Sequence, residues 1–68
     1  MTFVLKTRAI TGDLVPYRGE HIEYGTLFDA MQDAFLFHEV FGETIYVVDF
    51  ARDVTVSQVP TPQTMEKA

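Results

Sequence analysis

The stretch that decides the fold is residues 25–42, GTLFDAMQDAFLFHEVFG, the one segment with a clear helical pattern. When its residues are placed at about 100° steps, the apolar side chains form one broad arc and most acidic ones lie opposite. The residues in the apolar arc are Leu27, Ala30, Met31, Ala34, Phe37, His38 and Phe41. This pattern predicts an amphipathic helix over 27–41 that packs on a sheet.

Both ends of this helix carry capping signals. Thr26 is the expected N-cap, and Asp29, three residues later, places a negative charge near the positive end of the helix dipole. Gly42 is the expected C-cap, because glycine readily takes the left-handed conformation that ends many helices. The predicted helix is about 22 Å long, enough to cover a small sheet.

Strand patterns lie on both sides of the helix. Residues 2–10 alternate as a central strand, and 20–24 alternate as a short edge strand. Residues 14–19 contain Pro16 and Gly19, which predict a loop or an irregular edge segment. Residues 44–50 and 53–59 follow as two more strands, joined by Ala51-Arg52 as a short hairpin turn.

The order of elements, β-(β)-α-β-β, predicts an α+β fold. One amphipathic helix is expected to cover one face of a three- to four-stranded, mainly antiparallel sheet. Residues 1–59 form the predicted single domain, and 60–68, PTPQTMEKA, a disordered tail. The other face of the sheet has no second layer in 68 residues, so dimerisation is expected to cover the apolar side chains that face outward there. The candidates are Val4, Ile10, Ile45 and Val47.

Composition argues against several classes of function. The chain has no cysteine, which excludes disulfides and thiolate chemistry, and its net charge of −5 repels nucleic-acid phosphates and anionic lipid. We therefore expect no direct binding to nucleic acid or membranes. Lys6 and Arg8 interrupt the apolar run near the N-terminus, so no signal peptide is predicted and a cytoplasmic location is expected.

No motif predicts catalysis, so we expect a protein that is not an enzyme and uses no cofactor. Ser57 is the only serine and lacks the G-x-S-x-G elbow, and the four glycines spell no phosphate-binding loop. The H-x-E spelling at His21-Ile22-Glu23 matches half of the zinc-deaminase signature, whose other half needs cysteines.

A small metal-binding protein remains a third hypothesis. His21 and Glu23 share one face of a strand, and a closed site would also need His38 from the helix. We instead expect His21 to face solvent, and His38 to pack in the apolar arc or to act as a cation near the helix C-terminus. No metal site is predicted.

Charge and exposed apolar residues are the most informative features. Residues 1–19 hold three basic residues and one acidic residue, whereas 20–53 hold eight acidic residues and only one basic. Leu36 and Val40 lie one turn apart on the polar side of the helix, among carboxylates. An apolar centre with a charged rim is typical of protein-binding surfaces. The predicted partner-binding residues are Asp29, Asp33, Leu36, Glu39, Val40 and Glu43.

Residues 20–59, in which an edge strand, a helix entered through a threonine and a hairpin follow one another, resemble small acidic inhibitors encoded by phages. Several anti-CRISPR proteins have this general architecture. The resemblance implies a lone acidic α+β domain that acts by occupying the basic surface of another protein, in the host cytoplasm if a phage encodes it.

The leading hypothesis is therefore a non-catalytic inhibitor or regulator that binds a partner protein with a basic surface, such as a nucleic-acid-binding surface. In the alternative, the acidity serves solubility and the protein is an assembly subunit that forms a homodimer.

Overall fold

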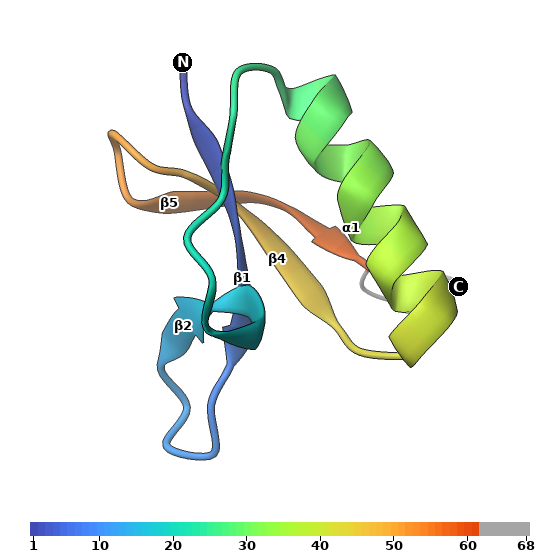
Figure 1. Cartoon of the computed structure of the whole chain (residues 1–68). Coiled ribbons are helices and arrows are strands. Elements are labelled where there is room, and N and C mark those ends of the chain that lie inside the picture. The colour runs from blue at the N-terminus through green and yellow to red at the C-terminus, as the bar shows by residue number, and fades with distance from the viewer. Residues whose placement is uncertain (62–68) are drawn as a thin grey trace, which may run out of the picture.

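The computed structural model describes residues 1–61, in which one α-helix packs on an antiparallel sheet (Figure 1). In chain order the elements are β1 (Phe3–Arg8), β2 (Leu14–Pro16), the 3-10 helix η1 (Tyr17–Gly19), β3 (Glu23–Tyr24), α1 (Leu27–Phe41), β4 (Ile45–Asp49) and β5 (Val54–Val59). The predicted α+β class is confirmed, with five strands in place of three to four. Most of the predicted tail, 60–68, lies outside the described residues.

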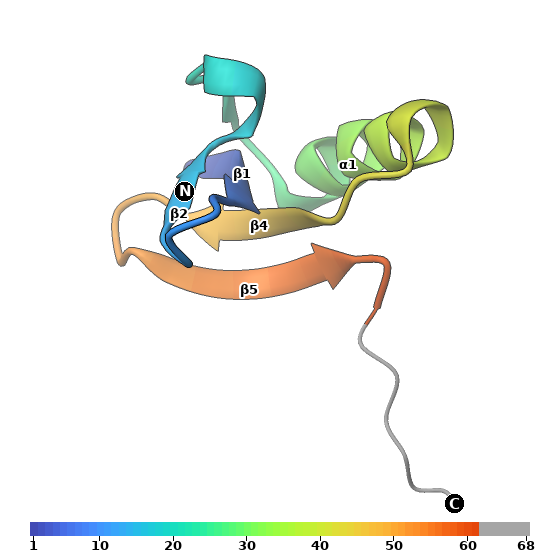
Figure 2. The ribbon, with the colours of Figure 1, turned by 90° about the horizontal axis from the view of Figure 1, so that it is seen from below.

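The sheet has the strand order β2-β1-β4-β5, and every pairing is antiparallel. β2 pairs with the second half of β1, and β3 pairs with its first half. Because β4 occupies the other side of β1, the strands β2 and β3 must share one edge of the sheet, and β5 forms the opposite edge. Figure 2 shows the helix on one side of this sheet.

The helix has the predicted bounds and the predicted caps. The Thr26 hydroxyl oxygen accepts a hydrogen bond from the backbone N–H of Asp29 at 3.1 Å. Gly42 takes the left-handed conformation, with φ of 72°, and its N–H donates to the carbonyl of His38 at 2.7 Å. Both signals were readable from the sequence because caps depend on local geometry alone.

The hydrophobic core lies between the helix and the sheet. Ala30 and Ala34 face the strands and have no exposed surface, so the helix backbone approaches the sheet closely at this point. The other core residues are Phe3, Leu5, Tyr17, Ile45, Val47 and Val59.

The prediction that Phe41 belongs to the core was wrong. Its side chain is 47% exposed, and that of Leu27, at the other end of the helix, is 41% exposed. The helical angle gives the direction of a side chain around the axis but says nothing of what lies opposite each turn. The first and last turns of this helix extend past the centre of a small sheet, so the middle of the apolar arc is buried and its ends are not.

The strands differ from their predicted bounds at the edges. The predicted edge strand over 20–24 is reduced to β3, whereas part of 14–19 pairs as β2. The expected two-residue hairpin turn is a four-residue connection over 50–53. Asp53 is in the left-handed region, with φ of 55°, and its N–H donates to the Asp49 carbonyl at 2.7 Å. A left-handed aspartate takes the part that glycine plays in many such turns.

The face of the sheet away from the helix does not carry the predicted apolar patch. Ile45 and Val47 belong to the core on the helix side, and Ile10 is fully exposed in the turn after β1. Val4 alternates with core residues along β1 and so faces away from the helix, opposite Val48 in register. Both side chains are buried, at 1% and 2% exposed, so they leave no apolar surface on this face for a second copy to cover.

Candidate protein-binding surface

Four of the six predicted binding residues lie exposed on the outer side of α1. Leu36 is 56% exposed and Val40 is 62% exposed, and Asp29 points in nearly the same direction as both around the helix axis. Glu39 is also exposed and lies beside Leu36 around the axis. We call Asp29, Leu36, Glu39 and Val40 the outer ridge. The sequence placed these side chains together because all four belong to one helix.

Asp33 lies on the flank of the helix rather than on the outer ridge. Its carboxylate accepts a hydrogen bond from the Tyr24 hydroxyl at 2.7 Å, and the residue is half-buried. A hydrogen bond to a charged acceptor typically contributes about 1.5–3 kcal/mol. Asp33 therefore ties the helix to β3, a role that the sequence did not reveal.

Glu43 follows the C-cap and is also held by the protein itself. Its Oε1 accepts a hydrogen bond from the Tyr17 hydroxyl at 2.6 Å, and Arg18 Nη1 lies 3.9 Å from the same oxygen. The Glu43 side chain remains 49% exposed, so its outer surface still contributes to the negative field around the helix C-terminus. Its ion pair with Arg18 reduces that contribution.

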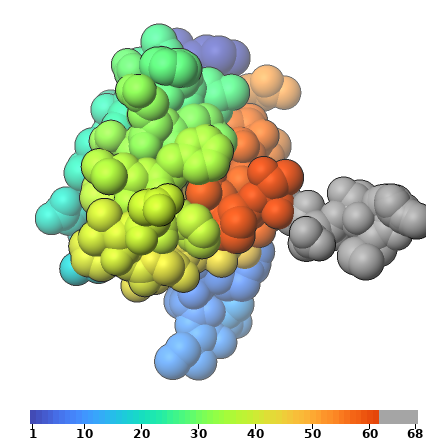
Figure 3. Space-filling model, turned by 90° about the vertical axis from the view of Figure 1, so that its right-hand side faces the viewer, coloured from blue at the N-terminus to red at the C-terminus, as the bar shows by residue number. Residues whose placement is uncertain are grey.

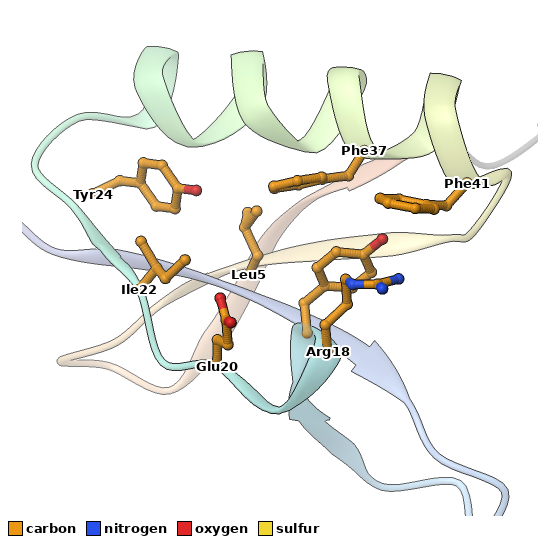
Figure 4. A pocket seen from close by; sticks show the side chains of 8 residues that line it. Leu5, Arg18, Glu20, Ile22, Tyr24, Phe37 and Phe41 are labelled. Carbon is orange, nitrogen blue, oxygen red and sulfur yellow. The ribbon is translucent and has the colours of Figure 1, made fainter.

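A small hollow opens between the helix and the segment from η1 to β3 (Figure 4). Its volume is about 150 Å³, close to that of a cavity known to hold one benzene molecule. Phe37 and Phe41 reach into it from the helix, and Ile22 and Tyr24 from the facing segment. The full lining is Leu5, Tyr17, Arg18, Glu20, Ile22, Tyr24, Phe37 and Phe41.

Arg18 closes one end of this hollow. Its guanidinium carbon lies 4.3 Å from the centre of the Phe41 ring, and the neighbouring Tyr17 ring packs against Phe37 with centroids 5.3 Å apart. Arg18 has a φ of 53°, a conformation that costs a non-glycine residue about 1–3 kcal/mol unless its surroundings hold it. The contacts with Phe41 and Glu43 supply that support. The sequence showed Arg18 only as one positive charge.

The basic residues near the N-terminus are on the other side of the sheet. Lys6 and Arg8 alternate with core residues along β1, so they face away from the helix, and the Arg8 guanidinium lies 5.1 Å from the Tyr46 ring centre. The acidic outer ridge and these two cations thus lie on opposite faces of the molecule. This separation keeps Lys6 and Arg8 from offsetting the negative field of the outer ridge.

Asp49 does not contribute to the acidic surface, although it belongs to the acidic part of the sequence. It is 2% exposed, the one buried charged residue in the described part of the chain. Its Oδ1 accepts a hydrogen bond from the Arg52 N–H at 3.3 Å, which helps to shape the turn between β4 and β5.

The three residues of the metal hypothesis do not converge. His21 Nε2 lies 3.0 Å from Glu23 Oε2, as strand geometry predicted, whereas His38 Nδ1 lies 2.9 Å from the Glu43 carbonyl oxygen. Within residues 1–61, no group of three or more potential metal ligands is found. In the same range, no helix has the length and apolar character needed to cross a membrane.

Two tyrosines are bound to carboxylates in this region, and their acidity changes accordingly. Burial raises the pKa of Tyr24, and the hydrogen bond and negative charge of Asp33 raise it further. Burial also raises the pKa of Tyr17, with a smaller contribution from Glu43 that Arg18 partly offsets. Both hydroxyls therefore stay protonated in the folded chain at a pH where an ordinary tyrosine ionises.

These shifts predict a loss of stability at alkaline pH. Below about pH 10 both tyrosines are protonated whether the chain is folded or unfolded, so their contacts stabilise the fold fully. Above that pH the unfolded chain releases these protons first, and the free energy of unfolding falls toward the raised folded pKa values. Urea unfolding between neutral pH and about pH 11 measures this fall. The double variant Tyr17→Phe, Tyr24→Phe should lose less stability than the parent over the same range, and an equally steep loss would contradict the assignment.

Comparison with protein-family models, with curated proteins and with solved structures found no match for this chain. The assignment of a function therefore depends on the geometry and charge described above.

Proposed function

We propose that this chain is a non-catalytic interaction protein, an inhibitor or regulator that occupies a basic surface of a partner protein. The observation that carries the proposal is the outer ridge, where two exposed aliphatic side chains lie beside free carboxylates on one rigid helix. Leu36 and Val40 are each more than half exposed to water. Protein-binding surfaces commonly have such an apolar centre within a polar rim.

The two acidic residues of the ridge are available to a partner. Within the described residues, neither Asp29 nor Glu39 forms a salt bridge with the chain itself. Exposed carboxylates of this kind steer a basic partner and raise the rate of association, whereas desolvated apolar contacts chiefly lower the rate of dissociation. The ridge thus combines both contributions.

The architectural resemblance to phage inhibitors supports one concrete version of this proposal. In that version the partner's basic surface is one that binds nucleic acid, and the carboxylates of the ridge take the place of phosphates. Asp33 and Glu43, which are already hydrogen-bonded within the chain, would add to the field without leaving their tyrosine partners.

The test is a charge reversal on the ridge, Asp29→Lys with Glu39→Lys. We expect it to lower the association rate with a partner recovered from the native lysate, and to flatten the dependence of that rate on salt. Leu36→Asp should raise the dissociation rate tenfold or more, on the order of 1.4 kcal/mol. Surface plasmon resonance at two ionic strengths gives both rates, and circular dichroism verifies that each variant is folded.

A matched control separates the ridge from net charge. Asp13→Lys with Glu20→Lys changes the total charge by the same amount but alters exposed residues away from the ridge. If this control reduces binding as much as the ridge variant does, net charge rather than the ridge drives association. If neither variant changes binding, the electrostatic proposal is wrong, and the assembly-subunit alternative takes precedence.

A further inference from the structure

The outer edge of β5 is open. β4 pairs with one side of β5, and no other described strand pairs with its second side. The backbone N–H and C=O groups that point outward there are free to pair with another strand. A hollow of about 370 Å³ follows this edge, and its lining includes four consecutive residues of β5, Thr55 to Gln58. Because Ser57 and Gln58 pair regularly with β4 and point to opposite faces, this lining places the hollow along the edge and not on one face.

This edge lacks the charge, proline and shortness that usually protect against pairing, and its one irregularity is a register shift that skips Val56 in the pairing with β4. Protected edges are short or carry prolines and charged side chains. The opposite edge has these features, since β2 has only three residues and ends in Pro16, and β3 has only two and contains Glu23. β5 has six residues and no charged side chain, and Val54 and Val56 remain 47% and 43% exposed.

Two exposed phenylalanines extend this apolar edge onto the helix. Asp33 and Phe37 face β3 and η1, because they contact Tyr24 and Tyr17 respectively. Phe28 and Phe35 point away from that flank by more than 130° around the helix axis and therefore lie on the flank toward β5. Figure 3 shows the helix and β5 side by side on this face. Phe28 is 69% exposed and Phe35 is 54% exposed.

We propose that this surface binds a second copy of the chain, with β5 pairing antiparallel to β5 of the copy about a two-fold axis. A two-fold pairing is self-complementary, because each strand presents the same outward groups to the other. The sheet then runs continuously through both copies, with both helices on one side. Phe28 and Phe35 of each copy lie above the junction, on the side of the helix toward the second copy, and the exposed Val54 and Val56 lie on the paired strands themselves.

Charge favours a second copy over a basic partner at this place. Two chains of net charge −5 repel each other, and the repulsion is least where the facing surfaces carry no charge. A basic partner has no carboxylate to bind along β5. Gln32 lies between Phe35 and Leu36 around the helix axis, and Glu39 of the outer ridge lies beside Phe28, so the two surfaces adjoin at Glu39. The self-association proposed here does not depend on the proposed function.

The exposed apolar side chains on this side supply part of the area that a dimer needs. A stable interface hides about 800 Å² per partner. One phenylalanine buries about 150–250 Å² when fully covered, so Phe28 and Phe35, at 69% and 54% exposed, supply about a quarter to a third of this area. The paired strand and its valines supply more. Part of each ring is already buried in the single copy, so pairing buries only the rest. We therefore expect a reversible dimer that dissociates on dilution.

Sedimentation equilibrium over a concentration series tests the proposal, with Thr55→Lys and Phe28→Glu as the two variants. Thr55 is exposed on β5, where a lysine protects the edge, and Phe28→Glu places a charge at the junction. Each should raise the dimer dissociation constant tenfold or more. The controls are Val15→Lys on the opposite edge and Leu36→Asp on the outer ridge, which should leave the constant unchanged. Circular dichroism verifies the fold of all four.

Two further measurements make the result specific. Hydrogen exchange should show β5 amides that become more protected as concentration rises, a result that dimerisation through another surface does not give. Added salt should leave the dimer intact or strengthen it, whereas it should weaken binding of a basic partner. A chain that stays monomeric at every soluble concentration would overturn the proposal. So would a dimer that Leu36→Asp disrupts and Thr55→Lys does not.

Discussion

Ile45→Ala should lower the free energy of unfolding by about 2–5 kcal/mol, because it leaves a cavity at the centre of the core. The Ile45 side chain has no exposed surface and packs within the cluster beneath the helix. A domain of this size has a total stability near the lower end of about 5–15 kcal/mol, so the variant should be close to unfolded. Urea unfolding followed by circular dichroism gives the value.

Leu36→Ala is the matched control for this loss. It also shortens an aliphatic side chain, but at a site that is 56% exposed and expected to bind a partner. We expect its stability to stay within about 0.5 kcal/mol of the parent, as is usual for surface substitutions. Equal destabilisation by the two variants would mean that the outer ridge is packed against other parts of the chain and is not available to a partner.

Ala34→Leu should destabilise the fold by about 1–3 kcal/mol through overpacking. Ala30 and Ala34 set the distance between helix and sheet, and a leucine at either position has no space to enter. For a domain of this length, each 1 kcal/mol corresponds to a fall of roughly 4–8 °C in the melting temperature. Thermal unfolding followed by circular dichroism measures this fall.

Gln32→Leu introduces the same side chain on the exposed side of the helix and should leave the melting temperature nearly unchanged. If Ala34→Leu is as stable as this control, the helix does not approach the sheet as closely as the burial of Ala34 indicates.

The helix and its caps were predictable because their signals are local. Hydrogen bonds between residues three or four positions apart, a side-chain cap at Thr26 and the freedom of Gly42 depend on neighbours in sequence. The outer ridge was predictable for the same reason, since the residues of one helical face keep their relative positions whatever the rest of the chain does. The class of fold followed from the order of the elements.

The candidate site was only partly predictable, because two of its acidic residues depend on distant partners. Asp33 binds Tyr24, nine positions away, and Glu43 binds Tyr17, which is 26 positions away. Nothing in the sequence pairs these side chains. Asp49 counted as a surface charge by composition, but its position opposite Phe3 in the sheet buries it.

The sequence by itself determined the helix, its ends, the alternation of the strands and the acidic, aliphatic character of the outer ridge. Only the tertiary structure decided that Phe41 lies at the rim of a hollow and that Ile45 and Val47 face the helix. It alone left β5 at an open edge beside Phe28 and Phe35. The physical reason is that periodicity fixes the direction in which a side chain points, whereas burial depends on what the rest of the chain places in that direction.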